Sequence, residues 1–149
     1  MEITRHFTAT TVIVSQGKAL LHLHKKLNLW LPVGGHIDRD ELPEDAAVRE
    51  VKEETGLEVK LYNSDKSLGM SDAKQLIRPA HLILENINQF HQHIDFIYYA
   101  TSESMELKPL DGETKNLKWL SADEIESLNM PGNVKVLSLE ALELLNSAN

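Results

Sequence analysis

The segment GHIDRDELPEDAAVREVKEETGL, residues 35–57, carries the strongest structural signal in this chain of 149 residues. Pro43 suits the first position of a helix, and the two acids that follow it favour a helix start through the helix dipole. Gly56 suits the position just after a helix end. The segment therefore predicts a helix over residues 43–55 with a turn on each side.

Three acids share one face of this predicted helix. At 3.6 residues per turn, Glu50, Glu53 and Glu54 lie within about 100° of one another, beside a stripe with Val48 and Val51 that we expect to face the core. Like charges at these spacings repel by about 0.2–0.5 kcal/mol per pair. Clustered carboxylates are the oxygen ligands that a hard divalent cation requires, and a solvated acidic surface is the alternative interpretation.

The spacing of the segment resembles the Nudix box: Gly35, five residues, Glu41, seven residues, and an uninterrupted run from Arg49 to Leu57. A chance match is expected on the order of 10⁻⁹ per start point. The whole chain, 1–149, resembles a single Nudix hydrolase domain. The resemblance implies an α/β fold, a Nudix-like α/β/α sandwich around a mixed β-sheet.

The resemblance also implies an enzyme that hydrolyses phosphoric anhydride bonds with a divalent metal. Glu50, Glu53 and Glu54, together with the backbone carbonyl of Gly34, match the ligands of Mg²⁺ or Mn²⁺. Arg49 matches the residue that orients a box carboxylate. In this family water attacks phosphorus in a nucleoside diphosphate linked to another moiety, so the catalytic residues would be Arg49, Glu53 and Glu54, with one further acid as a candidate.

That further acid is Glu113, a candidate general base. Some family members place the base on a later loop, and Glu113 lies six residues before Trp119. An exposed loop acid is the alternative for Glu113, and Glu53 is the alternative base. Glu41 matches the first box glutamate, whose role in the family is structural or outside the metal's direct ligands. Asp95 is a third acid, which would either face solvent or pair with a neighbouring histidine.

Three residues outside the box are candidates for substrate binding. Trp30 would stack on a base or pack in the core. Arg78 would contact a phosphate or lie on the surface. Asn133 resembles the asparagine that reads the base in family members that hydrolyse oxidised purine nucleotides, and the N-cap of the last helix is its alternative role.

The pattern outside the box predicts strands and two further helices. β-branched and apolar residues on both sides of Gln16-Gly17 indicate a hairpin, and Ser121 with Glu124 has the spacing of a capping box before a short helix. The last helix is expected from Asn133 to about residue 145. Strands are expected over residues 7–14, 19–24, 29–33, 57–62, 81–87, 93–100 and 117–120.

The amino-acid composition excludes some classes of binding partner. The 15 Lys and Arg against 23 Asp and Glu give a formal charge of −8, which argues against a nucleic-acid polymer and is compatible with a small nucleotide carried with a divalent cation. No apolar run approaches the ~20 residues that cross a membrane, and no signal-peptide core begins the chain, so we expect a cytoplasmic protein without a membrane partner.

The histidines offer a second kind of metal ligand. The chain has no cysteine, so metal ligands are limited to oxygen and imidazole. His22/His24 and His91/His93 are pairs two residues apart, and each pair would share one strand face, where zinc binding is one interpretation. The sequence leaves their roles open.

The leading hypothesis is a pyrophosphohydrolase that converts a nucleoside triphosphate, including an oxidised purine nucleotide, to a nucleoside monophosphate and pyrophosphate. A nucleotide-sugar or dinucleotide pyrophosphatase is the second interpretation. A non-catalytic Nudix module that senses a nucleotide or binds a protein is the third, and the intact set of acids disfavours it. Relatives are often homodimers, so a homodimer is compatible with the sequence.

Overall fold

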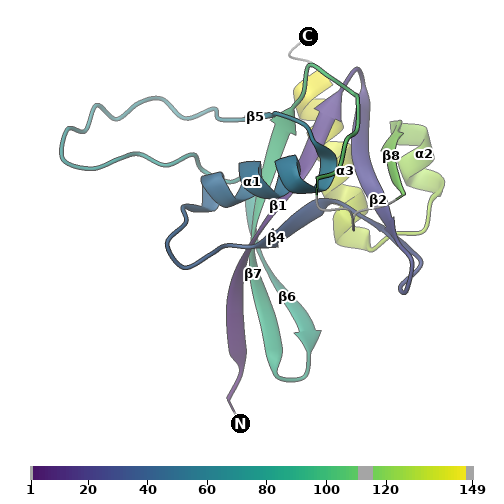
Figure 1. Cartoon of the computed structure of the whole chain (residues 1–149), viewed down its shortest axis with the longest axis horizontal. Coiled ribbons are helices and arrows are strands. Elements are labelled where there is room, and N and C mark those ends of the chain that lie inside the picture. Colours follow the sequence, from purple (N-terminus) through teal and green to yellow (C-terminus); the bar gives the residue numbers. More distant parts are fainter. Residues whose placement is uncertain (1, 111–115, 147–149) are drawn as a thin grey trace.

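The computed structural model describes residues 2–110 and 116–146. Within them, eight strands form one mixed sheet with helices on both sides (Figure 1). The strands are β1 (Thr4–Ser15), β2 (Lys18–His24), β3 (Leu29–Leu31), β4 (Val33–His36), β5 (Lys60–Leu61), β6 (His81–Asn88), β7 (His91–Thr101) and β8 (Leu117–Leu120). The helices are α1 (Pro43–Thr55), α2 (Ala122–Ser127) and α3 (Gly132–Asn146).

The long strands β1 and β7 organise the sheet. They pair in parallel from Thr4↔His91 to Val14↔Thr101. β2 pairs antiparallel with the end of β1, as the predicted hairpin requires, and β4 pairs antiparallel with its middle. β6 pairs antiparallel with β7, as expected. The β6–β7 hairpin and the start of β1 together form an arm that extends beyond the helices (Figure 1).

Alternation along β1 and β7 divides the core into two layers, as an α/β/α sandwich requires. Odd-numbered β1 residues and even-numbered β7 residues pack against α1, whereas the opposite set packs against α2 and α3. The α1 side buries Ala9, Ile13, Tyr98, Ala100, Ala46, Ala47 and Val51. The α3 side buries Val12, Val14, Ile97, Tyr99, Ile125, Leu137 and Ala141.

Helix α1 has the predicted boundaries but a rotated core face. Gly56 ends it at φ 78°, where its N–H donates to the Lys52 carbonyl at 2.9 Å. Val48, expected in the core, is 41% exposed, whereas Ala46 is buried. The buried stripe is therefore centred nearer to the acids than predicted, and it includes Glu50, whose side chain is only 15% exposed.

Three other expectations need correction in detail. The strand expected over 57–62 is only Lys60–Leu61, and the one over 29–33 is divided at Pro32, which has no N–H to donate. α3 begins at Gly132, so Asn133 lies inside its first turn and is not the N-cap. The capping box of Ser121 and Glu124 is present, which confirms that prediction. None of the helices in the described part of the chain is long and apolar enough to cross a membrane.

Gly34 packs closely against β1, and this contact gives a test of the fold. A Cβ at position 34 would lie 2.9 Å from Thr10 Cα and against the Ala9 carbonyl oxygen, so Gly34→Ala should destabilise the protein by about 1–3 kcal/mol through overpacking. Chemical denaturation measures this loss. Gly132→Ala is the control, because nothing lies within 4 Å of its added Cβ. Equal stability of the two variants would contradict the close approach.

Candidate active site

Arg49 connects three carboxylates at the surface of α1. Its Nε and Nη2 atoms donate to the two oxygens of Glu41 at 2.6 and 2.9 Å. Its Nη1 donates to Glu50 at 2.9 Å and to Glu53 at 3.3 Å. Nη2 also donates to the backbone carbonyl of His36, at the end of β4, at 3.1 Å. The Arg49 guanidinium therefore holds three parts of the chain in place relative to one another: two acids of α1, Glu41 in the preceding loop, and the end of β4.

The electrostatics of this network favour the ionised forms. The hydrogen bond from Arg49, together with the Asp38 backbone N–H, holds the pKa of Glu41 below its usual value. Hydrogen bonds to Glu41 and Glu50 raise the pKa of Arg49 in turn. Such bidentate, charge-assisted pairs add geometric specificity as well as energy. Glu41 thus has a structural contact of the kind that the sequence led us to expect.

The two glycines of β4 lie against the carboxylates of Glu54 and Glu50. The Gly34 N–H donates to Glu54 Oε2 at 3.2 Å. A Cβ on Gly35 would overlap the carboxylate of Glu50, so a larger residue there would require that side chain to move. The structure therefore brings two of the chain's own glutamates against these glycines. Coordination by the Gly34 carbonyl stays a prediction.

The donor set of α1 fits a hard divalent cation by its chemistry. Glu50, Glu53 and Glu54 supply carboxylate oxygens, and the glycines of β4 leave the backbone accessible beside them. The three carboxylates do not converge on one point: among the described residues, the trio of ligand atoms within 4.8 Å of one another is formed by histidines. Two of the glutamates pair with Arg49 and one with Gly34, so binding one cation would require rearrangement of their side chains.

A cleft of about 240 Å³ opens on the other face of the sheet edge. Gly34 and Gly35 line it, together with Asn133 from α3. The two glycines therefore touch the box glutamates as well as the cleft. The other lining residues are Thr8, Thr10, Leu31, Pro32, His36, Glu85, His93, Asp95, Ile97, Val134 and Leu137.

The structure does not bring every candidate into this cleft. Trp30 packs against the core cluster beside α3, and the cleft is lined by its neighbours Leu31 and Pro32 instead. Arg78 is exposed and pairs with Asp65 at 3.1 Å, in the segment between β5 and β6, none of which lines the cleft. Glu113 lies outside the described residues.

The cleft contains two acids, Glu85 and Asp95. The sequence singled out only Asp95, and the expectation that it faces solvent or pairs with a histidine needs correction, because its carboxylate is buried against two threonine hydroxyls. Asp95 is 4% exposed and accepts hydrogen bonds from the hydroxyls of Thr8 at 3.0 Å and Thr10 at 2.8 Å. Glu85 lies beside it, and burial, followed by the Asp95 carboxylate, raises the pKa of Glu85 to about 7. The alternation of β6 was visible in the sequence, but its register against β7 was not.

Comparison with known proteins matches the NUDIX domain model to residues 4–139. A crystal structure of a NUDIX-family hydrolase from Clostridium perfringens is 48% identical, with a TM-score of 0.87, over 96% of this chain and 99% of that one. A Bacillus subtilis protein named "Putative 8-oxo-dGTP diphosphatase" is 29% identical over 132 residues, 87% of this chain and 76% of that protein.

Another relative is a much longer protein. The Danio rerio m7GpppN-mRNA hydrolase NUDT17 is 28% identical over 107 residues, which are 68% of this chain. The match spans about a third of that relative, 34% of its length.

The raised pKa of Glu85 predicts a pH-dependent stability difference. An acid whose pKa rises from 4.5 to about 7 on folding weakens the fold as pH increases through that interval, because the unfolded chain releases its proton first. At pH 8, Glu85→Gln should therefore raise the free energy of unfolding by about 1–2 kcal/mol, after allowing for solvent screening, and so raise Tm. At pH 5 it should change Tm little.

Thermal unfolding in the presence of a chelator measures this difference. Glu143→Gln, at an exposed position of α3, is the control and should give the same small effect at both pH values. A Glu85→Gln effect that does not depend on pH would contradict the acid pair.

Proposed function

Because this chain belongs to the NUDIX family of hydrolases, we propose that it hydrolyses a purine nucleoside triphosphate, oxidised purines included, to the monophosphate and pyrophosphate. The supporting observation is the place of the cleft. Gly34 and Gly35 line it and also touch two box glutamates. A nucleotide with its base in the cleft would therefore extend its phosphates toward the glutamates of α1.

The chemistry at phosphorus would use the acids of α1. We propose that Glu50, Glu53 and Glu54, with the Gly34 carbonyl, hold Mg²⁺ or Mn²⁺. When bound, the cation would neutralise charge on the phosphate oxygens and favour attack by water. Arg49 positions Glu50 and Glu53 through its Nη1 hydrogen bonds. Positioning of this kind reduces the entropy that attack must overcome.

Glu53 is the proposed acceptor of the proton that the attacking water releases. Its side chain is 46% exposed, against 15% for Glu50, so solvent and substrate reach its carboxylate more readily. Its hydrogen bond from Arg49 also favours a defined orientation. Glu113 stays the alternative base.

Recognition of the base would come from polar groups in the cleft. The Asn133 amide can donate and accept at once, which suits the edge of a purine. Glu85, with a pKa of about 7, is protonated in a large fraction of molecules at neutral pH and can then donate a hydrogen bond, while Asp95 accepts. Such mixed donors and acceptors can pair with the donors and acceptors on the edge of a purine. The Bacillus subtilis relative supports this choice by its name alone.

The metal requirement gives the first test. Millimolar Mg²⁺ or Mn²⁺ should be needed for turnover and should raise Tm, because an ion that binds only the folded chain stabilises it. Glu54→Gln should lose most of kcat and all of the metal-induced shift in Tm, yet leave the metal-free protein as stable as before, since a like-charge contact is relieved. Glu58→Gln, at an exposed acid just beyond the helix, is the control. Activity and Tm that ignore both Mg²⁺ and chelator would contradict the metal site.

Substrate choice is tested with Asn133→Ala and a product screen. In Mg²⁺, nucleoside triphosphates should be hydrolysed to monophosphate and pyrophosphate faster than nucleotide sugars or dinucleotides. Asn133→Ala should lower kcat/KM for the preferred purine nucleotide about tenfold, or about 1.4 kcal/mol, with little change in Tm because alanine favours the helix. Val136→Ala, exposed on the same helix, is the control.

Two results would contradict this choice of substrate. A change in kcat/KM of less than about twofold in Asn133→Ala would show that Asn133 does not contact the base. Faster hydrolysis of nucleotide sugars or dinucleotides would select the second interpretation, and binding without turnover of any of these compounds would select a sensing module.

A further inference from the structure

Four histidines gather on the arm, next to the cleft. β1 and β7 pair in parallel with His6 opposite His93, and His91 lies two residues from His93 on the same face. β4 places His36 opposite Thr8, two residues from His6. Alternation puts all four imidazoles on the face of the sheet that carries the cleft, and His36 and His93 line it.

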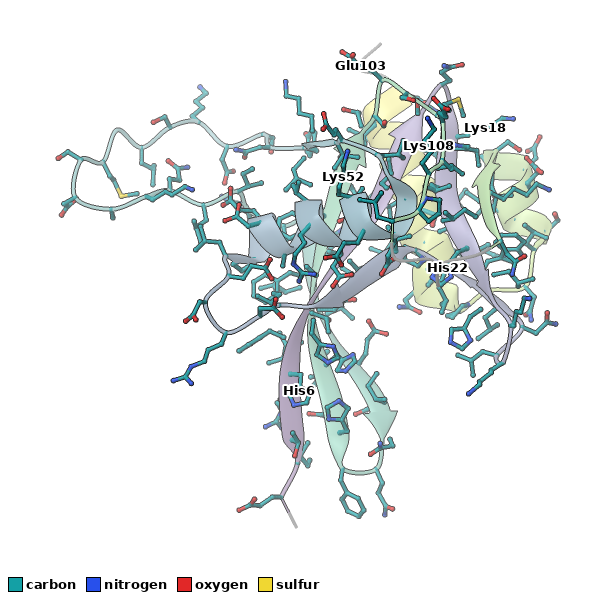
Figure 2. The ribbon with its side chains drawn as sticks, in the orientation of Figure 1. His6, Lys18, His22, Lys52, Glu103 and Lys108 are labelled. Carbon is teal, nitrogen blue, oxygen red and sulfur yellow. The ribbon has the colours of Figure 1, made fainter. Side chains whose placement is uncertain are left out.

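The rings are close enough to share one ion. The Nε2 atoms of His91 and His93 are 3.1 Å apart. The ligand atoms of His6, His91 and His93 all lie within 4.8 Å of one another. The His6 and His91 ring centroids are 4.6 Å apart, and that of His36 lies 5.2 Å from that of His93. Figure 2 shows His6 on the arm, with further imidazole rings beside it.

We propose that His6, His91 and His93 bind one transition-metal ion, with Zn²⁺ as the ion that this donor set favours, at a site separate from the box glutamates. Tetrahedral zinc with Zn–N bonds of ~2.0–2.1 Å separates its nitrogen ligands by about 3.3 Å. The His91–His93 pair already has nearly this separation. His6 is exposed, so a rotation of its side chain closes the larger gap at small cost.

The surroundings of His93 favour the neutral ring that a metal requires of this ligand. Burial, followed by the neighbouring charges of His36 and His91, lowers the pKa of His93. Clustered imidazoles without an ion would repel one another whenever two were protonated, so a shared cation gives a reason for their proximity. His36 is the nearest further imidazole for a fourth position, which water can also fill.

Ligand chemistry separates this site from the one on α1. Imidazole binds Zn²⁺, Cu²⁺ and Ni²⁺ and is a poor ligand for Mg²⁺, whereas carboxylates suit Mg²⁺. Saturating Mg²⁺ should therefore fill the glutamate site and leave the histidines to zinc. Because His93 lines the cleft, an ion bound there would add positive charge at one edge of the cleft.

Equilibrium dialysis with Zn²⁺ in excess Mg²⁺ tests the proposal, with protein that carries no histidine tag. The chain should bind one Zn²⁺, and His6→Asn and His91→Asn should each weaken binding at least about tenfold. Co²⁺ used instead of Zn²⁺ should give the intense visible absorption of a tetrahedral site. Circular dichroism and Tm confirm that each variant is folded, and exposed His6 is the substitution least disruptive to the core.

Two controls make the result specific. His24→Asn changes a histidine of the other pair, on β2 and away from the arm, and should leave Zn²⁺ binding unchanged. Glu54→Gln should also leave it unchanged, which separates this site from the proposed catalytic one. Absence of Zn²⁺ binding in Mg²⁺, or equal losses in His6→Asn and His24→Asn, would show that the cluster is only packed imidazoles and overturn the proposal. Loss of Zn²⁺ binding in Glu54→Gln would place the ion on α1 instead.

Discussion

The Arg49 guanidinium is the interaction on which the site depends. Helix α1 packs four small or apolar side chains against the sheet, and the carboxylate of Glu50, only 15% exposed, lies beside them, so charge enters a partly buried surface. Burying carboxylates is costly unless they are paired. Arg49 pairs with Glu41, Glu50 and Glu53 at once and also reaches the His36 carbonyl, so it ties the helix to the loop before it and to β4. The position of the acids follows from this pairing.

The edge strand β4 joins two faces of the sheet. Its glycines leave space for Glu50 on the α1 side and receive the carboxylate of Glu54, while they line a cleft on the α3 side. A side chain at either position would fill the space between acid and cleft. Half-buried Glu85 and buried Asp95 also line the cleft, and the four histidines continue along the same face onto the arm. The glycines of β4, the acids Glu85 and Asp95, and the histidines therefore lie next to one another along this face of the sheet.

Local signals explain what the sequence predicted well. Pro43, Gly56 and the capping box each act within a few residues, so α1 and α2 begin and end as expected. Long-range pairing explains what was missed. The approach of Glu85 to Asp95, and of His6 to His93, depends on strand register, which a single sequence does not contain. The sequence left Trp30 between stacking on a base and packing in the core. In the structure it packs against the core cluster, while its neighbours Leu31 and Pro32 line the cleft.

The central claim is that the acids of α1 form a divalent-cation site beside Gly34. Anomalous scattering from a crystal of the protein grown with Mn²⁺ tests it most directly, because the signal locates the ion without assumption about its ligands. The account predicts a peak within coordination distance of the carboxylates of Glu50, Glu53 or Glu54. An ordered Mn²⁺ found elsewhere, with these glutamates still paired to Arg49 and Gly34, would contradict it.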